Sequence, residues 1–332
     1  MSIRTLPVRP DLAQLRHQAK DLLRAIERGD PEALAELREH SPRTDRAAAT
    51  LADAQHALAR SYQASSWARL VHACELIDAI WRDDVDAAMN LVVAHPDMLH
   101  EHARIRENNW GPPMTYAANL GRDRIIRMLH KLGARDTEWA LGRAVLQGKI
   151  ATARMLHEML GSPEPPDGAL AGPAYTLSVS GTAFALSIGG RIIDPRGLDV
   201  NAMEHLLGTD SRNPAAKHRI LEMYEEHGFE PPNTPVMALH RGRINLLEQH
   251  LNEDPTLLTR TFTLEEIFHL APACHSTPYS AQGTPLDGTT LLHMAVYFDE
   301  FEIGEWLLER GMSIGASSNA AQQVVDYLAT KK

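Results

Sequence analysis

Two stretches of equal length decide the fold, residues 112–134 (PPMTYAANLGRDRIIRMLHKLGA) and residues 290–312 (TLLHMAVYFDEFEIGEWLLERGM). Each predicts a short helix with alanine at its sixth position, Ala117 or Ala295, followed by a turn and a longer apolar helix. Each then has glycine at its twenty-second position, where a helix commonly ends in a left-handed conformation. The chain therefore contains an internal helical repeat.

Four weaker copies align in the same frame. Their sixth-position residues are Ala79, Ala144, Ala185 and Ala238. A small side chain at this position allows stacked helices to approach closely. The six alanines are 38, 27, 41, 53 and 57 positions apart, which is irregular for a helical repeat of about 33 residues. We therefore expect two inserts, at about 190–215 and 257–287, which loop out from packed helices of constant length.

The last copy carries a family resemblance. Asp287-Gly288, followed by Thr290-Leu291-Leu292-His293-Met294-Ala295, resembles the ankyrin repeat, with Leu291 in place of the usual proline. The resemblance implies an all-α solenoid of about six degenerate helix-turn-helix repeats over residues 71–316. Residues 317–332 are then expected to form a capping helix, because an open last repeat would expose its apolar face.

The N-terminal residues 1–70 predict a separate small helical module. Asp11 is placed to cap a helix over residues 10–29, with Leu12, Leu15, Leu22 and Ile26 on one stripe and Gly29 at its end. The sequence from Leu6 to Leu34 also resembles the leader module that precedes the repeats in some bacterial ankyrin-repeat proteins. The two resemblances together cover nearly the whole chain.

Composition excludes several classes of protein. The formal net charge of −10 disfavours general binding of nucleic acid. The two cysteines, Cys74 and Cys274, cannot form a disulfide framework, and no apolar run has the length of a signal peptide or membrane span. We therefore expect a cytoplasmic protein that does not bind membranes.

We found no intact catalytic, nucleotide-binding or cofactor-binding motif, and so predict a non-catalytic scaffold. Ankyrin repeats are generic binding scaffolds, so the resemblance implies a protein partner held on the concave face. The eighth and ninth positions of each copy and the loop before the second copy would supply the contacts and are expected to be exposed. The predicted binding residues are Asn109, Trp110, Asn119, Gln147, His240, Arg241, Tyr297 and Phe298.

Three alternatives remain open at this point. The long inserts could fold over the predicted binding residues and bury them. They could also close a pocket on the concave face, as in an enzyme or a small-molecule binder. Cys274-His275 in the second insert is a weak candidate for a zinc site or a nucleophile pair. In the alternative without a functional site, Cys274 is a buried thiol and His275 is a loop histidine.

Overall fold

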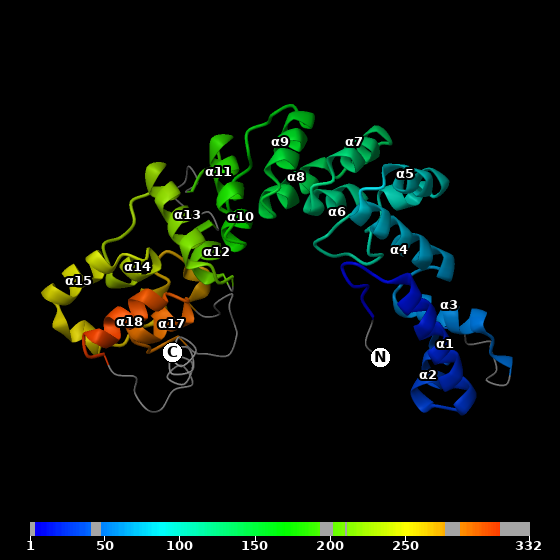
Figure 1. Cartoon of the computed structure of the whole chain (residues 1–332), viewed down its shortest axis with the longest axis horizontal. Helices are drawn as coiled ribbons and strands as arrows, with labels where there is room; N and C mark the ends of the chain where they lie inside the picture. The colour runs from blue at the N-terminus through cyan, green and yellow to red at the C-terminus, as the bar shows by residue number, and fades with distance from the viewer. Residues whose placement is uncertain (1–3, 41–47, 193–201, 210, 276–285, 313–332) are drawn as a thin grey trace. The chain divides into compact units, whose positions relative to one another are not determined.

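The computed structural model describes residues 4–40, 48–192, 202–209, 211–275 and 286–312. Within these ranges every regular element is a helix, and the one strand-like pairing is an isolated bridge from Phe262 to Thr289. The predicted all-α class is therefore confirmed. The chain divides into two compact units (Figure 1). Unit 1 comprises Met1–Ala144 and Ala151–Ser162, and unit 2 comprises Val145–Ile150 and Pro163–Lys332.

Unit 1 begins with three helices, α1 (Leu12–Arg28), α2 (Pro31–His40) and α3 (Leu51–Ser61). α1 starts where predicted, because the Asp11 carboxylate accepts the backbone N–H of Ala13 at 2.7 Å. It ends at Gly29, whose φ of 81° is left-handed. The apolar stripe of α1 supplies Leu15 and Ile26 to a buried cluster.

The fourth helix, α4 (Trp67–Arg82), belongs to the same core. Ser66 caps it by accepting the N–H of Arg69 at 3.1 Å. Leu70 and Cys74 lie in the cluster that also holds the α1 side chains. The predicted boundary at residue 70 thus falls inside unit 1, where the leader helices and the first repeat helix share one core.

Helix pairs then follow in sequence. The first three pairs are α4 with α5 (Val85–Ala94), α6 (Pro113–Leu120) with α7 (Asp123–Lys131), and α8 (Thr137–Leu146) with α9 (Ile150–Met159). Unit 2 contains α11 (Val179–Ser187) with α13 (Pro214–Glu226), α14 (Pro235–His240) with α15 (Ile244–Glu253), and α17 (Leu291–Tyr297) with α18 (Phe301–Glu309).

The same turn closes the first helix in all six pairs. Each frame alanine is buried, and the residue four positions after it has a positive φ. These residues are Asp83 (56°), Gly121 (68°), Gly148 (64°), Gly189 (99°), Gly242 (65°) and Asp299 (58°). In five pairs the next residue donates its N–H to the carbonyl of the frame alanine, at 2.7 to 3.1 Å. This is the Schellman ending of a helix, and it recurs in one register along the described chain.

Two copies share a loop of the same design. After the 3₁₀ helix η2 (Pro96–Leu99), the N–H of Ala103 donates to the carbonyl of Gly111 at 3.0 Å. After η3 (Pro255–Leu258), the N–H of Phe262 donates to the carbonyl of Thr289 at 2.8 Å. The acceptors lie just before α6 and α17, so the second insert is an enlargement of a loop that is short in the first case.

The described parts of the inserts pack against the helices, contrary to the expectation that they loop out. In the first, α12 (Ala202–Gly208) contacts α10 (Ala171–Tyr175) and buries Leu206 fully. In the second, η4 (Pro272–Cys274) contacts α12, and Phe268, which follows α16 (Leu264–Ile267), is fully buried. Apolar side chains drive this packing, since leaving them exposed would cost free energy. The predicted capping helix over 317–332 lies outside the described residues.

Candidate functional site

In unit 1 the eighth position of one copy is hydrogen-bonded to the fifth position of the next. Trp81 donates its indole N–H to the Tyr116 hydroxyl at 3.0 Å. Asn119 accepts from the Arg143 guanidinium at 2.7 Å and donates its amide to the Thr115 carbonyl at 2.9 Å. Asn119 is therefore buried, and the expectation that it faces solvent is wrong. Its side chain joins neighbouring copies instead.

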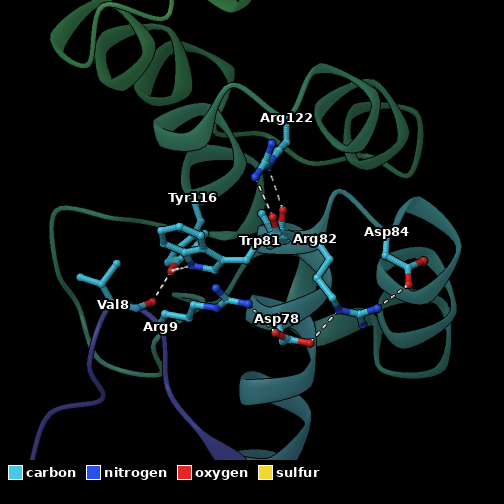
Figure 2. A network of polar contacts seen from close by, with 9 residues as sticks. Val8, Arg9, Asp78, Trp81, Arg82, Asp84, Tyr116 and Arg122 are labelled. Carbon is cyan, nitrogen blue, oxygen red and sulfur yellow. Dashed lines mark hydrogen bonds and ion pairs between the residues drawn. The ribbon is translucent and has the colours of Figure 1, made fainter.

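Trp81 and Arg82 occupy the eighth and ninth positions of the first copy, and the list of predicted binding residues omitted them. The frame that places Ala79 at the sixth position would have identified both. Arg82 lies between Asp78 (2.8 Å) and Asp84 (3.1 Å), and Arg122 donates to the carbonyls of Ile80 at 3.2 Å and Trp81 at 2.6 Å (Figure 2). Arg122 thus caps the carboxyl end of α4, where a cation is favoured by the helix dipole.

An N-terminal segment without regular secondary structure, residues 4–10, bends at Val8 and Arg9 and lies across these residues (Figure 2). We call it the strap. The Tyr116 hydroxyl donates to the carbonyl of Val8, and Arg9 pairs with Asp78 at 3.3 Å while its guanidinium lies 5.3 Å from the centre of the Trp81 ring (Figure 2). The sequence predicted no role for this segment, because its contacts are formed with residues far along the chain.

The loop over residues 100–112 holds the strap from its other side. Arg104 donates to the carbonyl of Leu6 at 2.8 Å, and Arg106 donates to the Thr5 hydroxyl at 3.2 Å. Leu6 is buried in the core of the leader helices. The strap therefore ties those helices to α4 and α6 within unit 1.

The same loop presents the predicted residues Asn109 and Trp110. Asn109 is exposed, as expected, and Trp110 is partly exposed with its ring centre 4.9 Å from that of Tyr116. The backbone N–H of Trp110 donates to the Asn108 side-chain oxygen at 2.8 Å, and the backbone N–H of Asn108 donates to the His102 ring at 3.3 Å.

A second tryptophan belongs to this cluster. The His102 ring lies 5.5 Å from that of Trp139 on α8, which is 39% exposed. Trp139 is the first position of its copy, so the frame of eighth and ninth positions did not identify it. Its residue type alone would have indicated Trp139 as a candidate, because tryptophan is enriched in protein-binding surfaces.

Beside the strap is a hollow of about 520 Å³. It is lined by Arg9, Pro10, Asp11, Leu12, Cys74, Glu75 and Asp78. Burial raises the pKa of the Cys74 thiol to about 12, so it stays protonated and unreactive at neutral pH. The polar character of the hollow comes from its carboxylates, which favour a cationic group.

In unit 2 the second insert covers the predicted residues His240 and Phe298. The His240 ring, which is fully buried, lies 4.6 Å from that of Phe298 and contacts the carbonyl of Ile267 at 3.4 Å. Phe298, only 5% exposed, also packs against Phe268 at 6.2 Å. The expected exposure of both residues is therefore wrong, and the alternative in which an insert buries them is confirmed here. Their aromatic rings are part of the core.

A buried ion pair adjoins this aromatic cluster. Lys217 contacts Glu300 at 2.8 Å, and His218 lies 2.9 Å from the same carboxylate. Lys217 also lies 5.0 Å from the centre of the Phe298 ring. Burial lowers the Lys217 pKa, and the carboxylate of Glu300 opposes that shift. The Lys217–Glu300 pair joins α13 to the turn between α17 and α18. Removing one partner would leave a buried charge unpaired and would strongly lower the free energy of unfolding.

Burial also lowers the pKa of His240 well below its usual value, with the Lys217 charge acting in the same direction. The Nδ1 atom of His240 has no hydrogen-bond partner in the described part of the chain. The cavity beside Lys217 and Phe298 measures about 10 Å³, room for about one water molecule. It offers no space for a substrate.

The other predicted residues have mixed environments. Gln147 is exposed, as expected. Arg241 is largely buried and pairs with Glu225 at 2.5 Å. Tyr297 is partly buried, with the Arg212 guanidinium 4.9 Å from its ring centre. Only Gln147 of these three presents its side chain freely.

The side chains of the weak candidate pair in the second insert contact backbone carbonyls in the described part of the chain. The Cys274 thiol is buried and lies 3.9 Å from the Glu204 carbonyl, and His275 contacts the Phe268 carbonyl at 3.0 Å. No group of three or more histidine, cysteine or acidic side chains in the described ranges is arranged to hold a metal ion. His293 bonds to Thr290 at 2.8 Å, a contact within its own copy.

Comparison with known protein families finds no match, and comparison with curated proteins finds no relative. Among the described residues, no helix has the length and apolar character needed to cross a bilayer.

Proposed function

We propose that this chain is a degenerate ankyrin-type repeat scaffold that binds a protein partner. Support for the repeat comes from the left-handed turn that recurs four positions after each of the six frame alanines. Further support comes from the two loops closed by equivalent hydrogen bonds, one before α6 and one before α17. A shared register of this kind is what stacked copies of one supersecondary unit require.

One observation carries the binding role. Trp110 and Trp139 keep exposed faces around a loop whose backbone is held by internal hydrogen bonds. Large aromatic side chains on a rigid support lose little conformational entropy on binding and dominate interface energetics. We infer that loop 100–112, together with the start of α8, is the recognition surface.

Charge supports a protein partner over a nucleic acid, since the net charge of −10 repels phosphate. The chain has only two cysteines, both of them buried, and so carries no disulfide framework, which supports a cytoplasmic location for the proposed scaffold.

The test begins with a photo-crosslinking amino acid in place of Asn109, which is exposed beside Trp110. A cross-linked partner is identified, purified and measured against the wild type and Trp139→Ser. We expect Trp139→Ser to weaken binding by at least about tenfold, the typical effect of a hot-spot aromatic. The matched control is Val93→Ser on α5, which removes a 60% exposed side chain outside the loop. Equal affinities for wild type and Trp139→Ser would contradict the proposed surface.

A further inference from the structure

The strap is held through its backbone carbonyls and through the side chains of Arg4, Thr5, Leu6 and Arg9. Arg104 donates to the Leu6 carbonyl, and Tyr116 donates to the Val8 carbonyl. Contacts to main-chain oxygens do not depend on the identity of the bound side chains, so peptides of different sequence can form them. Unit 1 therefore contains a surface that holds a peptide segment without regular secondary structure, and we call this surface, covered by the chain's own N-terminal segment, the groove.

Besides the Arg4–Glu36 ion pair at 2.8 Å, two side chains give the groove selectivity. Leu6 is 1% exposed and enters the core of the leader helices. Three positions later, Arg9 lies over Trp81 and pairs with Asp78. Pro7 and Val8 between them are exposed or partly exposed and leave more freedom of sequence. The groove is therefore selective for a peptide in which an apolar residue is followed three positions later by a cation.

The hollow beside the strap extends this preference. Asp11, Glu75 and Asp78 line it, and among the lining residues only Arg9 is basic. A bound segment with a further cation beyond the position of Arg9 would meet these carboxylates, which attract it through a pairing that solvent screens, since Asp11 and Glu75 are exposed.

We propose that the strap is an intramolecular occupant of a peptide-binding groove, and that a partner displaces it with a segment of the same chemistry. That segment carries an apolar residue followed three positions later by arginine or lysine. The inference rests on the proposed function, because loop 100–112 supplies both the proposed recognition surface and the strap-binding Arg104. Tethering keeps the strap at a high effective concentration, so a partner must compete with it.

The first test measures binding of a fluorescent peptide with the sequence of residues 4–10, RTLPVRP, to the full chain. We expect weak binding to the wild type, because the tethered strap competes. We expect binding at least tenfold tighter to the Leu6→Ala/Arg9→Ala variant, whose strap has lost both selective side chains. The control peptide is RTAPVAP, which lacks the same two side chains.

A folded double variant that binds RTLPVRP no better than the wild type, or no better than it binds RTAPVAP, overturns the inference. Circular dichroism and the melting temperature establish that the variant is folded.

A second measurement keeps Leu6 and Arg9 in place and removes only the Thr5 hydroxyl, which accepts one hydrogen bond from Arg106. Thr5 is exposed, so Thr5→Cys accepts a nitroxide spin label, while Cys74 and Cys274 are buried and resist labelling. Millimolar RTLPVRP is expected to produce a mobile spectral component that RTAPVAP does not produce. An unchanged spectrum overturns the inference even if the double variant fails to fold. If the spectrum is unchanged but Trp139→Ser loses partner binding, the proposed function is supported and only the inference about the strap is overturned.

Discussion

The loop before α6 and the loop before α17 are closed by the same hydrogen bond, yet their surroundings differ. In unit 1 the short loop leaves Asn109 exposed and Trp110 partly exposed. In unit 2 the long loop folds back and places Phe268 against Phe298. The two loops are closed by hydrogen bonds at equivalent positions, so the length and apolar content of each loop decide whether its aromatic residues are free to meet a partner.

The largest expected effect comes from truncating one aromatic residue in each loop region. Phe298→Ala should lower the free energy of unfolding by about 3–5 kcal/mol, because it leaves a cavity among buried rings. Trp110→Ala should cost about 1 kcal/mol or less, since its ring is partly exposed. Denaturant titration of both variants measures the difference. Similar losses in the two variants would contradict the distinction between the loops.

Removing the carboxylate that holds the α17–α18 turn should have an effect of similar size or slightly smaller. Glu300→Ala leaves the buried Lys217 without its ion-pair partner, and a loss of about 3–4 kcal/mol is expected. The control is Glu248→Ala, which breaks a more exposed pair with Arg310 and should cost less than about 1 kcal/mol. Denaturant titration compares them, and a small loss in Glu300→Ala would show that the turn does not depend on this pair.

Enlarging a frame alanine tests whether the two units share the same packing rule. Ala117→Leu in unit 1 and Ala295→Leu in unit 2 should each destabilise by about 1–3 kcal/mol, because both alanines are fully buried. Calorimetry of the two variants measures the loss. An unchanged stability at either site would mean that a larger side chain is tolerated there. That result would contradict close stacking of helices at that alanine.

The smallest effect concerns pH. The His240 pKa is lowered in the folded state, so folding favours the neutral ring and its contribution is complete above about pH 6.5. As pH falls below that value, the unfolded chain gains a proton first, and stability is lost at up to about 1.4 kcal/mol per pH unit. The slope should be shallower in His240→Phe, measured by denaturant titration between pH 7.5 and 5. Identical slopes in the wild type and His240→Phe would show that His240 does not cause the pH dependence of stability.

Local signals in the sequence were enough for the leader helix and the repeat register. Asp11 and Gly29 act within a few residues of themselves, and both perform the predicted capping. The alanine frame likewise predicts positions close to a turn, and the turn is observed in every copy.

Side-chain exposure could not be predicted in the same way. Asn119 is buried by Arg143, and His240 by the segment containing Ile267. The strap was missed for the same reason, since Val8 and Tyr116 are joined across 108 positions and no periodic pattern marks a segment without regular secondary structure.

The amino-acid sequence by itself determined the helical class, the register of the six alanines and the start and end of the leader helix. These depend on backbone geometry and on interactions between residues a few positions apart. Tertiary structure alone decided that the inserts pack, that Phe298 belongs to the core and that the strap lies over Trp81. Such choices depend on which distant apolar surfaces lose water together, and no local pattern encodes that outcome.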